Sequence, residues 1–454
     1  MVESGSIPLA RVVGDPFLGS LRVFGFPGFF TLSVHATRRA ININSQIRFA
    51  TLFVAAAKQV GLIAADRPLL VIGAGAAGVA AAMTAAELGI PVRLRETAAR
   101  PFAVQANCPS RWLHPHQYDW PLAWYSDPEF PRPEEDYLPL HWRADYSASV
   151  AAQWQTQYDD FLQRGYDFQA WYNSPPLPET SPEQLEAACD RDLATGNRFY
   201  FGAYLLCRGF PSEKVSIGKY SGFKFWANDP FTNFASLAKY CVRKKVLISG
   251  AGDGGLQDLL RFAFARTHPI ELVGNVIKVL NRTQNGLEAL ATCCSEIIES
   301  VLAPRIVGGS DPCRTFVESL NEGVLSDVFD QFEEIVTFDF GSNRLQLICA
   351  SIQFPSNFAL NRLLVRFLEK FVSVRYPQHP PLVSFGVSIK RVRGVLKHMC
   401  ANRANDCYGQ LHRCEIGGKT TTFDLLVVRH GFGREKRKLE KATGRRTKPP
   451  KRAS

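Results

Sequence analysis

A short apolar run that passes directly into a glycine-rich turn and then a helical pattern occurs twice in this 454-residue chain. The first copy reads Leu69 to Ile72 followed by Gly73-Ala74-Gly75-Ala76-Ala77-Gly78. The second reads Val246 to Ser249 followed by Gly250-Ala251-Gly252-Asp253-Gly254-Gly255. A buried strand that turns sharply into a packed helix is typical of parallel sheets, so the repeat predicts an α/β fold with two separate units. The length also exceeds what one hydrophobic core usually serves.

The first copy has every part of a dinucleotide-binding βαβ unit. Its glycines permit a tight turn, a close approach of backbone to a pyrophosphate, and close packing of helix on strand. An Ala-rich helical stretch follows, and a second apolar strand ends at Glu96, whose carboxylate can accept hydrogen bonds from ribose hydroxyls. The predicted contacts to the dinucleotide come from Gly73, Gly75, Ala76, Ala77, Gly78 and Glu96.

The second copy departs from this pattern in two ways. Asp253 places a carboxylate beside the predicted phosphate site, where it repels phosphate unless it faces away or bonds to backbone. Two apolar runs, Ile270 to Val273 and Val276 to Leu280, are imperfect candidates for the second strand, and neither ends in an acid or a basic cluster. We predict nucleotide contacts from Gly250, Gly252 and Gly255. The choice between NADH and NADPH stays open, as does a fold that has lost its nucleotide.

A third landmark lies near the C-terminus, where the apolar run from Phe423 to Val428 leads into Arg429-His430-Gly431-Phe432-Gly433. With the three landmarks in this order, the chain resembles the two-dinucleotide-binding-domain flavoproteins, which include pyridine-nucleotide-disulfide reductases and flavin-containing monooxygenases. In those proteins a strand ending in Ala-Thr-Gly returns to the FAD domain after the NAD(P) domain has been inserted. The resemblance implies a Rossmann-like FAD-binding domain with an inserted second Rossmann-like NAD(P)-binding domain. It also implies that Asp424 and Gly431 lie at the FAD site.

The loop that follows Glu96 supplies the candidate catalytic residues. Arg111 to Pro115, Tyr118 to Pro121 and Gly254 to Asp258 are similar to segments of a bacterial branch of FAD/NAD(P)-binding proteins. Ligands bind outside the carboxyl ends of parallel strands, so this loop should follow the cofactor cleft. Arg111 could pair with an FAD phosphate or an anionic flavin, and His114 could relay a proton. The alternative is structural, with Arg111 paired to Asp119 while Trp112 and Trp120 fill the core.

These landmarks divide the chain into segments. The N-terminal extension should pack on the FAD domain and contains a helix from about Ser45 to Val60. The predicted segments are the extension at 1–66, the first part of the FAD domain with a helical insertion at 67–200, the NAD(P) domain with insertions at 201–395, the FAD return segment at 396–433 and a disordered basic tail at 434–454.

The cysteines argue against one reaction class. A disulfide reductase needs two cysteines near the flavin, usually as Cys-x-x-Cys or Cys-x4-Cys, and neither spacing occurs. The adjacent Cys293 and Cys294 should lie on a helix. We therefore expect an FAD-dependent oxidoreductase that uses NAD(P)H to reduce the flavin and then oxygenates or reduces a small-molecule substrate, with the monooxygenase side favoured. A non-catalytic FAD/NAD(P)-binding redox sensor is the alternative.

Cys400, Cys407 and Cys414, with His398 and His412 nearby, form a candidate metal site. Zinc ligands generally come in pairs two to four residues apart, and these cysteines are seven apart. Alternating positions in a strand hairpin account equally well for the spacing. We predict no metal.

The net charge of +11 is concentrated at the end of the chain. Residues 434–454 carry ten Lys/Arg and two Asp/Glu, which leaves the rest near +3, so nucleic-acid binding is not expected outside this tail. The most apolar stretch, Leu69 to Ile90, contains three glycines of the first turn and Glu87, which disfavours a membrane span. The first residues lack a signal-peptide pattern, and a cytoplasmic enzyme is the expectation, with a homodimer left open.

Overall fold

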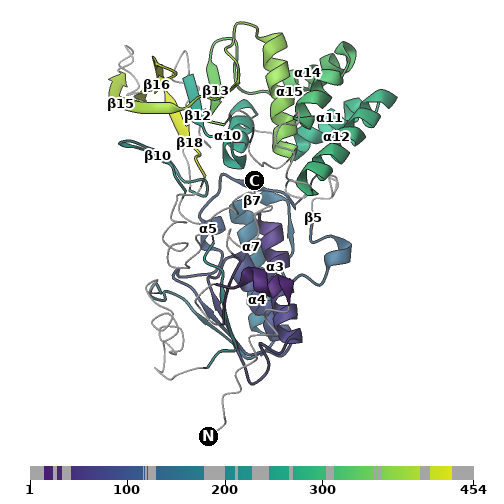
Figure 1. The fold of residues 1–454 in the computed structure, drawn as a ribbon, viewed down its shortest axis with the longest axis vertical. Coiled ribbons are helices and arrows are strands. Elements are labelled where there is room, and N and C mark those ends of the chain that lie inside the picture. The colour runs from purple at the N-terminus through teal and green to yellow at the C-terminus, as the bar shows by residue number, and fades with distance from the viewer. Residues whose placement is uncertain are drawn as a thin grey trace, which may run out of the picture.

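The chain forms two lobes stacked along its long axis (Figure 1). The computed structural model describes residues 15–23, 28–32, 42–115, 117, 120, 129–177, 200–209, 213–227, 245–264, 269–302, 311–351, 354, 359–398 and 409–431. Each lobe contains its own parallel sheet, and no described strand is shared between the two sheets. The predicted α/β fold with two units is confirmed.

The first unit is a five-stranded sheet in which every neighbouring pair of strands is parallel. Its apolar strands are buried because helices pack on one face and a smaller cluster around Leu70 and Tyr204 covers the other. The strand order is β1 (Phe29–Thr31), β9 (Ala203–Leu206), β2 (Leu69–Ile72), β3 (Val92–Arg95) and β8 (Phe168–Trp171). The main helices are α3 (Ile43–Gln59), α4 (Ala76–Glu87) and α7 (Ser147–Leu162).

The N-terminal segment is an integral part of this unit, not an extension that packs on it. Strand β1 pairs in parallel with β9 and forms the edge of the sheet, and Phe29 stacks on Tyr204 with ring centroids 4.2 Å apart. Helix α3 begins with a capping box at Asn42 and packs along α4. The helix predicted from Ser45 to Val60 is confirmed, but the boundary at residue 66 is wrong.

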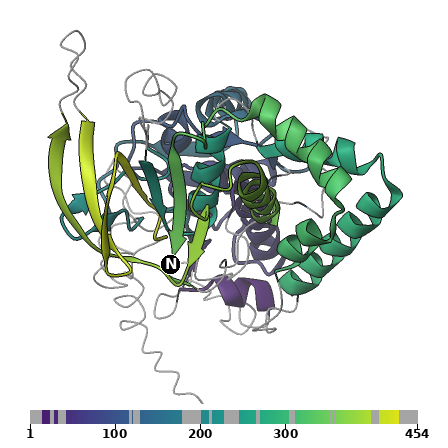
Figure 2. The ribbon, with the colours of Figure 1, turned by 90° about the horizontal axis from the view of Figure 1, so that it is seen from above.

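The second unit is a four-stranded parallel sheet with helices on one face and strands on the other, as the view from above shows (Figure 2). Its order is β14 (Val383–Phe385), β13 (Arg344–Cys349), β12 (Lys245–Ser249) and β18 (Leu425–Val428). The helices are α10 (Asp253–Ala263), α11 (Pro269–Leu280), α12 (Gln284–Leu302), α13 (Pro312–Ser319), α14 (Glu322–Ile335) and α15 (Ala359–Arg375). The antiparallel strands β15 (Ile389–His398), β16 (Gly409–Ile416) and β17 (Lys419–Phe423) cover the other face.

The second strand of this unit is not where the sequence pattern placed it. Both apolar runs proposed for it, Ile270 to Val273 and Val276 to Leu280, lie inside helix α11. The second strand of the unit is β13, which pairs with β12 and follows a helical insertion made of α11 to α14. The pair Cys293 and Cys294 lies on helix α12, as expected.

The predicted return of the chain to the first sheet is wrong. Strand β18, which precedes Arg429 and Gly431, pairs in parallel with β12 of the second sheet. In the other direction, β9 belongs to the first sheet although it lies within the segment assigned to the NAD(P) domain. Among the described residues the two units therefore follow one another along the chain, and the second is not inserted into the first.

Short elements complete the described structure. They are α2 (Pro16–Leu21), α5 (Ala103–Ala106), η1 (Pro133–Glu135), β4 (Trp112–Leu113), β5 (Glu129–Phe130), β6 (Trp142–Arg143), β7 (Asp145–Tyr146), β10 (Ser216–Ile217) and β11 (Tyr220–Ser221). Among the described residues, none of the helices is both long and apolar enough to cross a membrane. The basic tail and the helix expected after Ser181 lie outside the described residues.

Candidate dinucleotide sites

The first glycine turn is shaped by backbone that approaches too closely for any side chain. Gly73 adopts φ +108°, and a Cβ atom there would overlap the carbonyl of Cys207. A Cβ at Gly78 would overlap the carbonyl oxygen of Gly73, because strand and helix meet at that point. Gly75 differs, since a Cβ there would have no heavy atom within 4 Å. The turn therefore leaves open space at the glycine where a pyrophosphate is expected.

Glu96 lies at this turn. Its Oε2 accepts a hydrogen bond from the backbone N–H of Ala74 at 2.6 Å, and its Oε1 accepts one from Ala98 at 2.7 Å. Helix α4 begins at Ala76, so the backbone N–H groups of Ala76 and Ala77 lie in its first turn. A carboxylate acceptor, a helix N-terminus and open space thus converge at the carboxyl edge of the first sheet, which is the arrangement that holds the ribose and pyrophosphate of a dinucleotide.

The second glycine turn repeats this geometry. Gly250 adopts φ +112°, and a Cβ there would overlap the carbonyl of Arg429. A Cβ at Gly255 would overlap the carbonyl oxygen of Gly250, whereas one at Gly252 would meet nothing within 4 Å. Helix α10 begins directly after Gly252. The second unit therefore also offers a backbone cradle with open space above its middle glycine.

The strand beside each turn, β9 in the first unit and β18 in the second, is followed by two residues and then a glycine. This correspondence was not predicted from the sequence. Cys207 donates its backbone N–H to Ile72 at 2.7 Å, and Arg429 donates to Ser249 at 2.7 Å. Two residues later, Gly209 and Gly431 both have positive φ, +73° and +68°. The matching segments are Cys207-Arg208-Gly209 and Arg429-His430-Gly431. The signal was an apolar run, Ala203 to Leu206, that is separated from Gly209 by two residues, as Val428 is from Gly431.

The structure moves two predicted FAD contacts to the second unit. Asp424 precedes β18 at the amino end of the second sheet, where its Oδ2 accepts the backbone N–H of Lys245 at 2.8 Å. That position is at the opposite end of the β12–β18 pair from the second glycine turn, so Asp424 closes the start of the strand pair. Gly431 lies at the carboxyl edge, beyond the residue that touches Gly250. Neither residue belongs to the first unit.

Asp253, the carboxylate at the second turn, is hydrogen-bonded to the side chain of Asn361. Its Oδ1 accepts a hydrogen bond from Asn361 Nδ2 at 3.1 Å, and Asn361 Oδ1 accepts one from Gln117 Nε2 at 3.2 Å. Asn361 lies on helix α15 and Gln117 on the loop from the first unit. The start of helix α10 is thereby connected to the other lobe through two buried amides.

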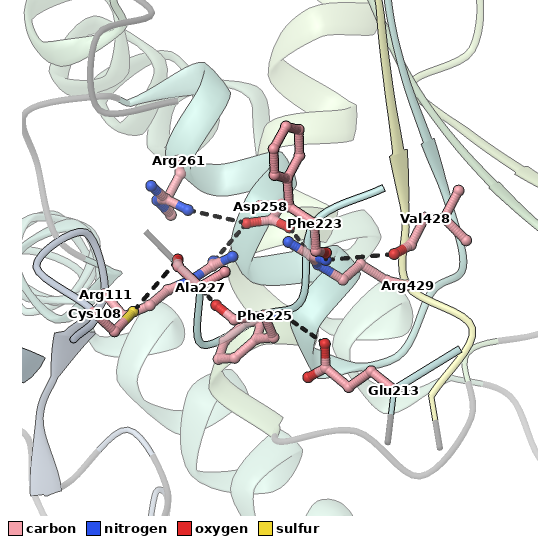
Figure 3. Close-up of polar contacts among 10 residues, drawn as sticks. All are labelled: Cys108, Arg111, Glu213, Phe223, Phe225, Ala227, Asp258, Arg261, Val428 and Arg429. Atoms are coloured by element: carbon pink, nitrogen blue, oxygen red, sulfur yellow. Dashed lines mark hydrogen bonds and ion pairs between the residues drawn. The ribbon is translucent and has the colours of Figure 1, made fainter. Parts of the chain in front are cut away.

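A buried ion-pair cluster joins the two units (Figure 3). Arg111 Nη1 lies 2.5 Å from Asp258 Oδ1, and Arg429 Nε lies 2.8 Å from Asp258 Oδ2. Arg111 also donates from Nε to the carbonyl of Phe225 at 2.9 Å, and its guanidinium carbon lies 3.9 Å from the centre of the Phe225 ring. Arg261 approaches Asp258 Oδ1 at 3.2 Å. The side chains of Arg111 and Asp258 are 2% and 0% exposed.

The charges in this cluster depend on one another. Burial by itself would raise the pKa of Asp258, but Arg111, Arg429 and Arg261 hold that pKa well below its ordinary value of 3.8. Burial lowers the pKa of Arg111, an effect that the charge of Asp258 opposes. Asp258 is therefore a carboxylate at neutral pH, shared among three guanidinium groups.

Arg111 makes a structural contact between the two units, because its guanidinium donates to Asp258 and to the carbonyl of Phe225. The catalytic role of Arg111 remains a prediction. The structural alternative predicted that Arg111 pairs with an acid, Asp119. The structure shows a pair with Asp258, and Asp119 lies outside the described residues. Trp120 packs in the core of the second unit, as that alternative expected. Arg111 and Asp258 come from two of the three segments that carried the local resemblance.

His114 lies in the same loop and is buried. Its carbonyl accepts the backbone N–H of Gln117 at 3.2 Å, and the next residue, Pro115, accepts a hydrogen bond from Asn44 in the first turn of α3 at 3.1 Å. The loop is thus fixed between the first unit and the second. Proton transfer by His114 remains a prediction.

The cysteine-histidine spacing falls largely in a hairpin. Strands β15 and β16 pair antiparallel, with His398 opposite Gly409 and Cys414 opposite Val392. Cys400 and Cys407 lie outside the described residues. In the part of the chain that the structure describes, no three His, Cys, Asp or Glu side chains are grouped to hold a metal.

No family model matches this chain, and no curated protein matches it. Among solved structures, it is similar to the bacillithiol disulfide reductase from Staphylococcus aureus, with 9% identity, a TM-score of 0.37 and coverage of 81% of this chain and 76% of that one. It is similar to T. acidophilum thioredoxin reductase, with 11% identity, a TM-score of 0.32 and coverage of 81% and 78%.

A 2-naphthoyl-CoA reductase is also similar, with 15% identity, a TM-score of 0.31 and coverage of 84% of this chain but 35% of that one. This chain thus spans about a third of the length of that reductase. The preference for the monooxygenase side gains no support from these comparisons. Similarity at this level assigns no activity to this chain.

Proposed function

We propose that the protein is an FAD-dependent NAD(P)H oxidoreductase, with FAD in the first unit and NAD(P)H in the second. The observation that carries the proposal is the repeated backbone geometry of two glycine turns, each open above its middle glycine, Gly75 or Gly252. Two cradles of this shape suit two dinucleotides. Bound FAD would accept a hydride from NAD(P)H and pass the electrons to a small-molecule acceptor.

The residues of the first unit fit the adenosine and pyrophosphate portion of FAD. The backbone at Gly75 and the first N–H groups of α4 would hold the phosphates, and Glu96 would accept hydrogen bonds from a ribose hydroxyl. Glu96 already accepts two backbone hydrogen bonds, which fix its carboxylate at the turn. In the second unit, Gly252 and the start of α10 would hold the pyrophosphate of the coenzyme.

The acceptor that follows the flavin is either oxygen, with hydroxylation of a small substrate, or the substrate itself. The sequence contains no Cys-x-x-Cys or Cys-x4-Cys, the spacings usual for disulfide exchange beside a flavin. We therefore place the protein outside the dithiol mechanism, while both oxygenation and direct reduction stay within the proposal.

The test begins with the purified full-length protein. We expect it to carry bound FAD, and we expect NADH or NADPH to bleach the flavin absorbance under anaerobic conditions. Admitting oxygen with and without candidate substrates then separates oxygenation from reduction. A protein that binds flavin which neither coenzyme reduces would contradict the two-cofactor mechanism, and one that takes up no flavin would contradict the proposal as a whole.

A second candidate is a nucleotide-binding redox sensor without turnover. It is favoured by the end of strand β13, where the second unit has Cys349 followed by Ala350 and Ser351 and no acid. Replacing Gly252 with leucine distinguishes the candidates. An enzyme loses flavin reduction by coenzyme, whereas a sensor has no turnover to lose in either form.

A further inference from the structure

The two units differ at the residue that follows their second strand. In the first unit, Gly73 donates its backbone N–H to Arg95 at 2.7 Å, and the next residue is Glu96. In the second unit, Gly250 donates to Ile348 at 2.9 Å, and the next residue is Cys349. Strand pairing gives the same alignment, with Ile72 beside Arg95 and Ser249 beside Ile348. Cys349 therefore occupies the position that Glu96 holds in the first unit.

In dinucleotide-binding folds, the side chain at this position contacts the ribose of the dinucleotide. An acid there accepts a hydrogen bond from a free 2′-hydroxyl, and its charge repels a 2′-phosphate. A thiol is a weak hydrogen-bonding group, and Cys349 is 6% exposed and packs in the core of the second unit. The two residues after it, Ala350 and Ser351, are exposed and uncharged. At this position the second unit has neither the attraction that favours NADH nor the repulsion that rejects NADPH.

We propose that the second turn binds NADH and NADPH with similar affinity, and that Cys349 is the specificity-determining position. The inference rests on the proposed function, because it assigns the coenzyme to the second unit. Both coenzymes share the pyrophosphate that the Gly252 cradle would hold, so the shared part supplies the binding. The residue at the end of β13 then discriminates only weakly between a 2′-hydroxyl and a 2′-phosphate.

Calorimetric titration of the FAD-loaded protein with NAD⁺ and with NADP⁺ measures this directly. We expect the two dissociation constants to agree within about fivefold. The variant Cys349→Asp should favour NAD⁺ by about tenfold or more, because a charge-assisted hydrogen bond is gained and phosphate repulsion is introduced. Cys349→Ser, similar in size and uncharged, should keep the wild-type ratio. Glu96→Cys in the first unit should weaken flavin binding and leave the coenzyme ratio unchanged.

A wild-type preference for either coenzyme above about fivefold overturns the inference, whatever the variants do. An unchanged ratio in Cys349→Asp overturns the assignment of this residue. If the buried aspartate prevents folding, Cys349→Asn tests the same point without a charge, and it should shift the ratio toward NAD⁺ through the 2′-hydroxyl alone. Binding of neither coenzyme would instead refute the proposed function, a result that the titration distinguishes from equal binding.

Discussion

At the scale of single residues, substitutions at Gly75 and Gly78 should have separate effects, the first on the proposed cofactor binding and the second on folding. A methyl group at Gly75 enters open space at an ordinary φ of −73°, whereas one at Gly78 overlaps the carbonyl oxygen of Gly73. We expect Gly75→Ala to keep the stability of the apoprotein and to lose about 1–3 kcal/mol of FAD binding, because the methyl occupies phosphate space. Gly78→Ala should cost about 3 kcal/mol of folding free energy. Urea unfolding and flavin titration of both variants check this, and equal behaviour of the two would contradict it.

Asp258 has a comparable role in stability. Asp258→Asn leaves Arg111 and Arg429 buried without a carboxylate, and we expect it to cost about 3–5 kcal/mol. The exposed pair of Arg375 with Asp330 provides a control, since Asp330→Asn should cost less than about 1 kcal/mol. Chemical denaturation at pH 7 measures both. Similar small losses in the two variants would show that the cluster contributes little.

The lowered pKa of Asp258 also predicts a dependence on pH. Its contribution to the free energy of unfolding is fully present above 3.8, the ordinary pKa, and is lost as the pH falls toward and through the lowered native pKa. The wild-type protein should therefore lose stability more steeply below about pH 4 than Asp258→Asn does. Denaturant midpoints between pH 5 and pH 3 provide the comparison, and parallel profiles would contradict the assignment.

The sequence predicted the residues whose role depends on backbone geometry and missed those whose role depends on a distant partner. Gly73, Gly78 and Glu96 were correctly placed at a turn because strand-to-helix geometry permits few alternatives there. The contact of Arg111 with Asp258 was missed because the two residues lie 147 positions apart in the chain. Local patterns contain no record of such a contact.

At the scale of elements, β1 tests whether the N-terminal segment belongs to the first unit. Phe29 is buried on the face of the sheet that also holds Leu70 and Tyr204. We expect Phe29→Ala to cost about 3–5 kcal/mol of folding free energy, as for a core phenylalanine. Leu52 on α3 is nearly half exposed, and Leu52→Ala should change stability by less than about 0.5 kcal/mol. Thermal and urea unfolding measure both values. If Phe29→Ala left the free energy of unfolding unchanged, β1 would not be an integral part of the first unit.

Elements were predicted well where a strand and a helix follow closely, and poorly where an insertion or a choice between sheets intervenes. The four helices between α10 and β13 carry the second strand far beyond the usual crossover distance. Strand β18 was recognised as a buried strand, but apolar residues alone do not specify which of two sheets it joins. Both errors concern topology, which pairing across long sequence separations decides.

At the scale of the whole molecule, the Arg111 cluster should fix the two lobes relative to each other. In Arg111→Met, Asp258 keeps Arg429 and Arg261, so we expect a smaller loss of stability than in Asp258→Asn. The junction at Phe225 should nevertheless loosen, since Arg111 donates to the Phe225 carbonyl and lies against its ring, beside the contacts of Cys108 with Ala227 and of Trp226 with the core of the first unit. Faster hydrogen exchange at residues 223–227 and a larger radius of gyration in solution scattering are the expected results. Exchange as slow as in wild type would show that other contacts suffice.

The order of the strands along the chain has a consequence for how the protein is made. Every described strand of the first sheet lies between residues 29 and 206, and every described strand of the second lies after residue 244. A ribosome releases the N-terminal lobe before it has translated the strands of the other, and domains generally fold as units during synthesis. The first glycine turn, where we propose that FAD binds, can therefore assemble on a nascent polypeptide, without awaiting a closing strand from the far end.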